Sequence, residues 1–326
     1  MHLSTFAPAK VNLELRVGPL RADGYHEILT LMAPLDLGDE VLVRLSPRTG
    51  PVTCAVPGMP ELSGAENLAS RAALAFKERF GVQNGVDIRI DKRTPVTAGL
   101  GGGSSDAAAV LRCLARGFGI WDPSALADLA LSIGSDVPFF LWPGPSWAAG
   151  RGERLVPARV PALHLVLLYP LDPGLAIRAG DAYAWLDEAR QVLRRAPSVG
   201  RPGRFSVSRA GNDLERPCLV HRPALAPLLG LLRGAGARRV MMSGSGPTFF
   251  GVFSDQGAAR RAALTIRREE GSGLRFRVLA VRTVRGQPRV TQWRSPRSAS
   301  SRSTKRSSRP TSRSRLTPAS SSGTSK

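Results

Sequence analysis

The chain has 326 residues, enough for two compact domains, and its apolar content of 42% is typical of a globular protein. Its net charge of +21 is unevenly divided. Residues 285–326 carry eleven Lys or Arg and no Asp or Glu, and elsewhere 35 basic residues face 25 acidic ones, which leaves +10. A net charge of +10 on the rest of the chain suits the binding of an anionic small molecule as well as that of a nucleic acid.

The cysteines and the apolar pattern restrict the class further. Cys54, Cys113 and Cys218 are odd in number and far apart, and with four histidines they offer neither a disulfide framework nor metal-ligand spacing. Unpaired cysteines favour a reducing cytoplasm. No apolar run approaches the ~18 residues of a membrane span, and residues 1–10 lack the pattern of a signal peptide. We expect a cytoplasmic protein that does not bind membranes, and the sequence indicates no oligomeric state.

The first predicted element is a strand over residues 11–17, where apolar and polar residues alternate. Lys10 and Asn12 share its polar face. A turn then leads to Tyr25 and His26, which could stack on a planar base and bind its edge, although such a pair is more often ordinary loop surface. A second strand is predicted over residues 41–45, followed by a helix over residues 66–80.

A glycine-rich stretch follows a predicted strand at residues 86–90 and runs into a predicted helix. Glycines bring backbone N–H groups close to a ligand, and a helix N-terminus adds partial positive charge, so the stretch reads as a phosphate-binding loop. A plain turn is the alternative. The glycine-rich stretch fits neither the GxxxxGK[ST] nor the GxGxxG pattern of other phosphate-binding loops. The candidate nucleotide-binding residues are Pro95, Val96, Thr97, Ala98, Gly99, Leu100, Gly101, Gly102, Gly103, Ser104 and Ser105.

Asp136 is the candidate acid in the next segment. A helix over residues 122–133, with Asp122 as its N-cap and Pro123 in its first turn, ends at a glycine. Asp136 lies between that glycine and an apolar run, so its carboxylate should stand at the base of an apolar wall. A turn or capping aspartate is the alternative reading.

We place a domain boundary in the proline-spaced segment near residue 157. A buried strand follows at residues 163–169, then a helix at 181–195, a loop at 197–204 and a helical region from 210. A second glycine turn at 243–247 leads into a strand, followed by a helix at 256–270 and a strand at 276–281. Residues 285–326 are too polar to fold, so we predict a disordered basic tail for which nucleic-acid binding is the less favoured role. The predicted domains are residues 1–157 and 158–284.

Three separated pieces resemble the motifs of the GHMP small-molecule kinases: residues 7–13, 95–109 and 134–140. Residues 21–26, Arg-Ala-Asp-Gly-Tyr-His, narrow the resemblance to members that phosphorylate 4-diphosphocytidyl-2-C-methyl-D-erythritol in non-mevalonate isoprenoid synthesis. The resemblance runs from about residue 6 to residue 284. It implies an α+β fold with a ribosomal-protein-S5-like N-terminal domain and a ferredoxin-like C-terminal domain.

The resemblance also implies ATP as phosphoryl donor, Mg²⁺, and a cytidine diphosphate adduct of methylerythritol as the small-molecule substrate. Lys10 and Asp136 match the catalytic pair, with Asp136 acting as general base or merely orienting the hydroxyl. No side chain is assigned to the metal. Asn67 and Lys92 join the ATP-binding residues, and the substrate-site residues are Asn12, Tyr25, His26, Asn212, Asp213, Gly244 and Gly246.

One position departs from the pattern, and two other functions stay open. Ala179 stands where the family usually has Thr, so a hydroxyl near the substrate is missing. Another GHMP kinase, acting on mevalonate-type, homoserine or sugar substrates, is the first alternative, and Tyr25–His26 argues against it because a small aliphatic alcohol does not need them. A non-catalytic nucleotide- or nucleic-acid-binding protein is the second.

Overall fold

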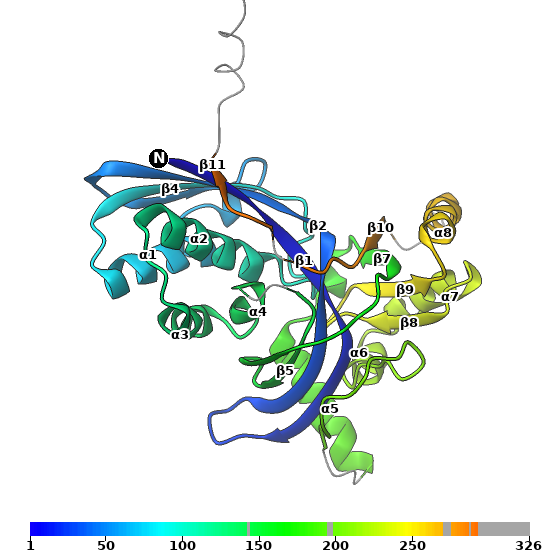
Figure 1. The fold of residues 1–326 in the computed structure, drawn as a ribbon. Coiled ribbons are helices and arrows are strands. Elements are labelled where there is room, and N and C mark those ends of the chain that lie inside the picture. Colours follow the sequence, from blue (N-terminus) through cyan, green and yellow to red (C-terminus); the bar gives the residue numbers. More distant parts are fainter. Residues whose placement is uncertain (142–143, 194–197, 270–274, 287, 293–326) are drawn as a thin grey trace, which may run out of the picture. The chain divides into compact units, whose positions relative to one another are not determined.

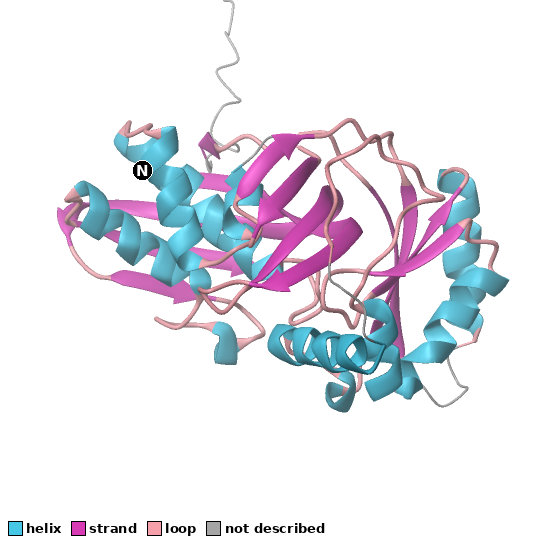
Figure 2. Cartoon of the chain, turned by 90° about the horizontal axis from the view of Figure 1, so that it is seen from below, coloured by secondary structure: helices cyan, strands magenta, loops and turns pink. Residues whose placement is uncertain are grey.

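The computed structural model describes residues 1–141, 144–193, 198–269, 275–286 and 288–292. Residues 1–293 form one compact unit. Of the tail predicted to be disordered, residues 285–326, residues 287 and 293–326 lie outside the described residues. The described part of the chain combines helices with two β-sheets, which confirms the α+β class (Figures 1 and 2).

The larger sheet is built around two long antiparallel strands, β1 (His2–Leu20) and β2 (His26–Thr49), which run side by side (Figure 1). Within the described residues it has seven strands, in the order β11-β1-β2-β4-β3, with β5 paired to β2 and β6 to β5. The remaining members are β3 (Val52–Ala55), β4 (Asn84–Asp91), β5 (Ser146–Gly150), β6 (Arg154–Pro157) and β11 (Thr291–Gln292).

Register shifts interrupt the β1–β2 pairing between Pro8 and Lys10 and again between Asn12 and Glu14. Such irregularities turn side chains and are common beside functional sites. Here they flank Lys10 and Asn12. The apolar residues of β1 from Ala7 to Val17 are buried, so this stretch of the strand is fixed by the cores on either side of it.

Helices α1 (Leu68–Phe80), α2 (Gly102–Phe118), α3 (Pro123–Ile133) and α4 (Val137–Leu141) gather on one side of the larger sheet (Figure 2). Small buried residues of α2, among them Ala107, Ala108 and Ala109, let it pack closely against β1, β2 and α1. Residues with large side chains, such as Phe76 and Phe139, fill the remaining space. Because α2 is buried along most of its length, the loop at its N-terminus is held by a rigid element.

The smaller sheet has four strands among the described residues, in the order β10-β7-β9-β8. Its members are β7 (His164–Pro170), β8 (Arg239–Met242), β9 (Phe249–Phe253) and β10 (Phe276–Arg282). Helices α7 (Ala226–Gly234) and α8 (Gln256–Arg268) pack on it, while α5 (Ala179–Leu193) packs with α6 (Glu215–His221). The described residues also form the short 3-10 helices η1 (Pro60–Leu62), η2 (Pro173–Leu175) and η3 (Pro223–Leu225).

After β10 the chain returns to the larger sheet, where β11 pairs with the outer edge of β1 (Figure 1). Val290 packs against the core of that sheet, and the Arg112 guanidinium donates to the Pro288 carbonyl over 3.0 Å. The prediction of a disordered tail from residue 285 is therefore wrong for residues 288–292. The β1–β11 pairing, the Val290 side chain and the bond from buried Arg112 tie these residues to the larger sheet.

Most predicted elements are confirmed, including the strands near residues 86 and 276 and the helix capped by Asp122, whose side chain accepts from the Ala125 N–H. Residues 194–195 of the predicted 181–195 helix lie outside the described residues. Two strands were predicted far too short, since 11–17 and 41–45 are parts of β1 and β2. The helical region expected from residue 210 begins only at Glu215. Elements α4, β3, β5, β6, β8 and β11 were not predicted.

Candidate active site

Two cavities meet at the glycine-rich loop that leads into α2. The hairpin cavity, about 650 Å³, is lined by β1, β2 and α5, with Lys10, Tyr25 and Asp136 among its residues. The helix cavity, about 480 Å³, is lined by residues of α1 and α2, the loop and the segment around η1. Gly99, Gly101 and Ser104 border both cavities. A molecule in either cavity can therefore approach a molecule in the other across this loop.

Lys10, Asn12 and Asp136 lie together in the hairpin cavity. The Lys10 ammonium donates to the Asn12 side-chain oxygen over 2.6 Å and lies 3.4 Å from an Asp136 carboxylate oxygen. The Lys10 side chain is only 5% exposed, while that of Asp136 is 37% exposed. A buried cation thus faces an accessible carboxylate. The sequence placed these two residues in one site, and the structure brings them into contact.

Asn12 is itself fixed by a chain of hydrogen bonds. Its side-chain amide donates to the Thr30 hydroxyl over 2.8 Å, and Thr30 in turn donates to the Glu14 carbonyl over 2.7 Å. All three residues are buried. Because a buried amide with both ends bonded has little rotational freedom, the oxygen that faces Lys10 is held in place.

The glycine loop adopts the backbone that its composition predicts. Gly99 and Gly101 have φ of 71° and 69°, the left-handed region that other residues adopt only at a cost. A Cβ on Gly101 would lie 2.9 Å from the Phe140 ring and 3.1 Å from the Lys10 side chain. The loop therefore passes directly over Lys10. Glycine at position 101 is required by space as well as by conformation.

The second glycine turn packs on this loop from the smaller sheet. The Ser243 hydroxyl donates to the Gly99 carbonyl over 3.0 Å, and a Cβ on Gly244 would lie 3.3 Å from the Lys10 ammonium. Gly244 lines the hairpin cavity. Gly246, with φ of 83°, is packed against the Met242 side chain, so it shapes the turn.

Asn212 and Asp213 support the site from outside its cavities. The Asn212 amide donates to the carbonyls of Met242 and Gly244 over 2.9 and 2.7 Å. The Asp213 carboxylate accepts from the Val17 N–H over 2.9 Å. Neither residue lines the hairpin cavity. The structure thus places both behind the glycine turn, where they hold it against β1.

Asn67 and Lys92 line the helix cavity, each with partners of its own. Asn67 caps α1 by accepting from the Ala69 N–H over 2.8 Å and donates to the Leu62 carbonyl over 2.7 Å. The Lys92 ammonium, whose side chain is 7% exposed, is bonded to two carboxylates. In the described structure both side chains are engaged with the protein and shape the cavity wall.

Tyr25 and His26 line the hairpin cavity at the tip of the β1–β2 hairpin. The His26 ring lies 5.1 Å from that of Tyr183 in a stacked arrangement, and its Nε2 atom lies 3.0 Å from an Asp187 carboxylate oxygen. Burial, and secondarily the charge of Asp136, raises the pKa of Tyr183 to about 12. The Tyr25 ring is half exposed and the Arg151 guanidinium lies over it at 4.9 Å.

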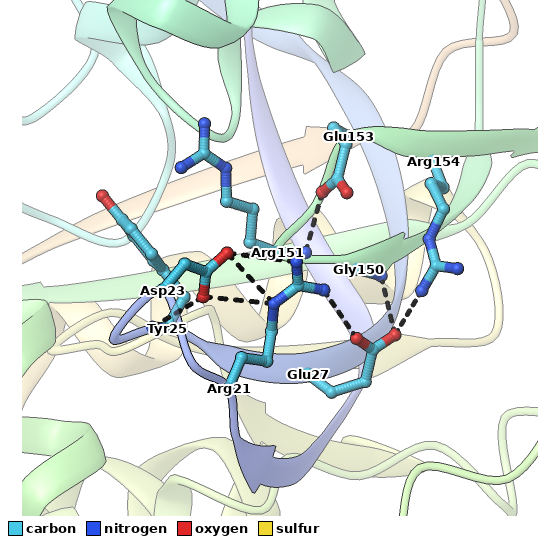
Figure 3. Close-up of polar contacts among 8 residues, drawn as sticks. All are labelled: Arg21, Asp23, Tyr25, Glu27, Gly150, Arg151, Glu153 and Arg154. Atoms are coloured by element: carbon cyan, nitrogen blue, oxygen red, sulfur yellow. Dashed lines mark hydrogen bonds and ion pairs between the residues drawn. The ribbon is translucent and has the colours of Figure 1, made fainter.

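A network of charged groups ties the hairpin tip to the turn between β5 and β6 (Figure 3). Glu27 accepts from Arg21 over 2.9 Å, from the Gly150 N–H over 3.1 Å, and from Arg154. Arg21 also bonds Asp23, whose pKa it lowers, and Asp23 accepts from the Tyr25 N–H over 3.2 Å. One carboxylate thus links the segment that bears Tyr25 to the one that bears Arg151.

Sequence reasoning did not find several residues of the site. Tyr183 and Asp187 had a usable signal, because they lie four residues apart on a predicted helix and so share a face. Arg151 and Thr30 had none. Ala179, the departure noted in the sequence, begins α5 and lines the hairpin cavity, so the missing hydroxyl would have faced that cavity.

The described residues include no group of three or more His, Cys, Asp or Glu that could hold a metal ion. Cys54, Cys113 and Cys218 are buried and free of disulfides. Among the residues described, no helix is long and apolar enough to cross a membrane.

Comparisons with known proteins find relatives that match most of this chain. The model of the GHMP kinase N-terminal domain matches residues 67–144, and that of the GHMP kinase C-terminal domain matches residues 193–272. The chain is 69% identical over 313 residues to a 4-diphosphocytidyl-2-C-methyl-D-erythritol kinase from Anaeromyxobacter dehalogenans, covering 95% of this chain and all of the relative. It is 40% identical to the enzyme of the same name from Deinococcus radiodurans, covering 80% and 87% of the two chains.

Solved structures of kinases also match most of this chain. A crystal structure of 4-(cytidine 5'-diphospho)-2C-methyl-D-erythritol kinase superimposes with a TM-score of 0.67 and 35% identity, covering 86% of this chain and 99% of that one. A homoserine kinase from Cytophaga hutchinsonii has a TM-score of 0.66 at 20% identity, covering 89% and 97%, and shares the fold.

Proposed function

Because this chain belongs to the 4-diphosphocytidyl-2-C-methyl-D-erythritol kinases of the GHMP kinase family, we propose that it transfers the γ-phosphoryl group of ATP to a hydroxyl of that cytidyl compound. The product is the 2-phosphate, an intermediate of non-mevalonate isoprenoid synthesis. The observation that carries the proposal is the meeting of two cavities at the glycine loop, beside the Lys10–Asp136 pair.

The proposed arrangement places ATP in the helix cavity with its phosphates at the glycine loop. The N-terminus of α2 adds favourable partial charge there. The cytidyl substrate takes the hairpin cavity, with its base near Tyr25 and His26 and its erythritol hydroxyl near Asp136. Phosphoryl transfer depends mainly on positioning and charge stabilisation, both of which this arrangement supplies.

Asp136 is proposed to receive the proton of the attacking hydroxyl as the O–P bond forms and the bond from the γ-phosphorus to the leaving oxygen of ADP breaks. Its carboxylate is accessible, as a base that meets substrate must be. Lys10, held by Asn12, would offset negative charge on the transferring group. Removal of Asn12 should therefore misplace Lys10.

Mg²⁺ is part of the proposed reaction as an ion that enters with ATP. It is usually held by one or two carboxylates together with substrate phosphates rather than by a cage of protein ligands. The described residues fit this, since they form no such cage and Asp136 is exposed near the loop. When bound, the ion would neutralise charge on the phosphates. We also propose a cytoplasmic location, because the three cysteines are unpaired.

The test is an assay of the purified full chain with ATP, Mg²⁺ and 4-diphosphocytidyl-2-C-methyl-D-erythritol. We expect release of ADP and a phosphorylated cytidyl product, identified by mass. Parallel reactions with mevalonate, homoserine and galactose test the alternative GHMP activities. Turnover of one of these with none of the cytidyl compound would overturn the assignment.

A further inference from the structure

A buried cluster of three charged residues lies at the base of the glycine loop. The Lys92 ammonium donates to an Asp39 oxygen over 2.7 Å and to an Asp106 oxygen over 2.6 Å. The exposed fractions of the side chains are 7% for Lys92, 0% for Asp39 and 3% for Asp106. One ammonium thus faces two carboxyl groups in a region almost without water. If both were ionised, the cluster would carry an uncompensated negative charge.

The two carboxyl groups have unequal partners. The second oxygen of Asp39 accepts from the N–H groups of Arg93 and Thr94 over 2.6 and 2.7 Å. The second oxygen of Asp106 is buried and has no hydrogen-bond partner among the described residues. Hydrogen bonds stabilise an anion, and Asp106 lacks them at one oxygen, so Asp106 is the carboxyl group whose negative charge this cluster supports least.

The pKa of Asp106 agrees with this division. Burial, opposed by Lys92 and aided by Asp39, raises it to about 8. The Asp106 carboxyl group also affects Cys54 on β3. Burial is the main cause that raises the pKa of the Cys54 thiol, and the charge of Asp106 contributes a smaller increase. Glu61 and Glu66 line the same cavity as Asp106.

The cluster is placed to act on anions at the loop. Asp106 is in the first turns of α2, and both it and Lys92 line the helix cavity with Gly101 and Gly103. A Cβ on Gly102 would lie 3.1 Å from the Lys92 ammonium, so the loop backbone lies directly over the cluster. A negative charge on Asp106 opposes the attraction of phosphates to the helix N-terminus.

We propose that Asp106 is a proton-linked positioning residue for the nucleotide. Its carboxyl group carries a proton when phosphates occupy the helix cavity, and it loses that proton to solvent when the cavity is empty at alkaline pH. The inference rests on the proposed binding of ATP at this loop. With Asp106 neutral, Lys92 and Asp39 balance each other and the loop attracts phosphates. With Asp106 charged, affinity falls, so the binding of each nucleotide takes a proton from the buffer.

Calorimetric titration of the full chain with ADP at pH 8.5, in two buffers of different ionisation enthalpy, counts the protons taken up. ADP does not titrate there, because the second ionisation of a phosphate group is complete well below that pH. We expect uptake of roughly half a proton in the wild type, from the linkage of binding to a group that titrates near this pH. Asp106→Asn should bind ADP without uptake. Asp128→Asn, an exposed aspartate of α3, is the matched control and should behave as wild type.

The outcomes separate this inference from the proposed function. Absence of ADP binding overturns both, whereas ADP binding without proton uptake by the wild type overturns this inference alone. Uptake that persists in Asp106→Asn also overturns it. The KM for ATP of the wild type is an independent test that requires no variant. Between pH 8 and 9.5 this KM should rise, by at most tenfold per pH unit. The KM for the cytidyl substrate should not rise with it. A constant KM for ATP over that range contradicts the proposal.

Discussion

At the scale of single residues, the Lys10–Asp136 contact joins a strand and a helix N-terminus that are 126 positions apart in the chain. Asp136 immediately precedes α4, whose Phe139 and Phe140 are fully buried. The apolar run expected beside Asp136 therefore anchors it from one side. Its carboxylate remains exposed on the other side, where the hydroxyl of a substrate can reach it.

Asp136→Asn tests the proposed base. The amide keeps the shape of the side chain but cannot accept the proton, so kcat should fall by ~10²-fold or more, the scale of general acid–base effects. Steady-state kinetics with the cytidyl substrate measures this loss. Nucleotide affinity, measured by titration with ADP, should change little because Asp136 does not line the helix cavity. Unchanged turnover would remove Asp136 from the mechanism.

Asp187→Ala tests how His26 is held. Removal of its carboxylate frees the His26 ring, so the KM for the cytidyl substrate should rise about tenfold, as expected for loss of one charged hydrogen bond. The KM for ATP should stay within twofold. Glu188→Ala is the matched control, since this next residue of α5 is 66% exposed and faces His221. Equal effects of the two substitutions would argue against a positioning role for Asp187.

At the scale of elements, sequence patterns predicted those parts of the site that are continuous in the chain. The glycine loop, its helix and the capped helix before Asp136 follow from local rules about φ, capping and periodicity. The contact of Lys92 with Asp39, 53 residues away, depends on how strands are paired, and that of His26 with Asp187, 161 residues away, depends on how α5 lies against the β1–β2 hairpin. No local pattern encodes them.

The lengths of β1 and β2 were underestimated for a related physical reason. Alternation of polar and apolar residues marks a strand with one exposed face, and it reveals residues 11–17. At residues 7–9 β1 is buried on both faces and carries no polar side chain, so alternation disappears although the strand continues. The register shifts beside Lys10 and Asn12 also leave no mark on the sequence.

Glu27 offers a test of how two elements are joined at the hairpin cavity (Figure 3). Glu27→Ala removes the acceptor for Arg21 and the Gly150 N–H, so the hairpin tip and the β5–β6 turn should separate. We expect a several-fold rise in the KM for the cytidyl substrate and no change in that for ATP. Glu27→Gln keeps an acceptor oxygen and should be affected less. A larger effect of Gln than of Ala would contradict this role.

At the scale of the whole molecule, the chain joins its two sheets more than once. β1 extends past both, since its Leu15 and Val17 pack in the core of the smaller sheet and its Leu3 and Ala7 in that of the larger one. The segment after β10 makes a second connection by returning to β1. Cavities that take residues from both parts can therefore keep a fixed geometry between glycine loop and glycine turn.

Two truncations test the second connection. Ending the chain after Val284 removes β11 and the Pro288 carbonyl. Among the described residues this leaves the Arg112 guanidinium with the Phe6 carbonyl as its acceptor, although Arg112 is only 8% exposed. A buried charged group that loses a partner costs about 2–3 kcal/mol, so thermal unfolding should shift down by roughly 5 °C or more. Ending the chain after Trp293 keeps these contacts and should leave both the melting temperature and kcat/KM close to those of the full chain.

Arg112→Met identifies the cause of that shift. The substitution replaces the buried guanidinium with an apolar side chain of similar length. Loss of the Pro288 carbonyl then no longer leaves a buried charge without its hydrogen-bond partner. In this background the two truncated chains should differ in melting temperature by clearly less than they do with Arg112. If the difference is unchanged, β11 and Val290 rather than Arg112 stabilise the connection. If both truncated chains melt with the full-length protein, residues 285–293 do not contribute to stability.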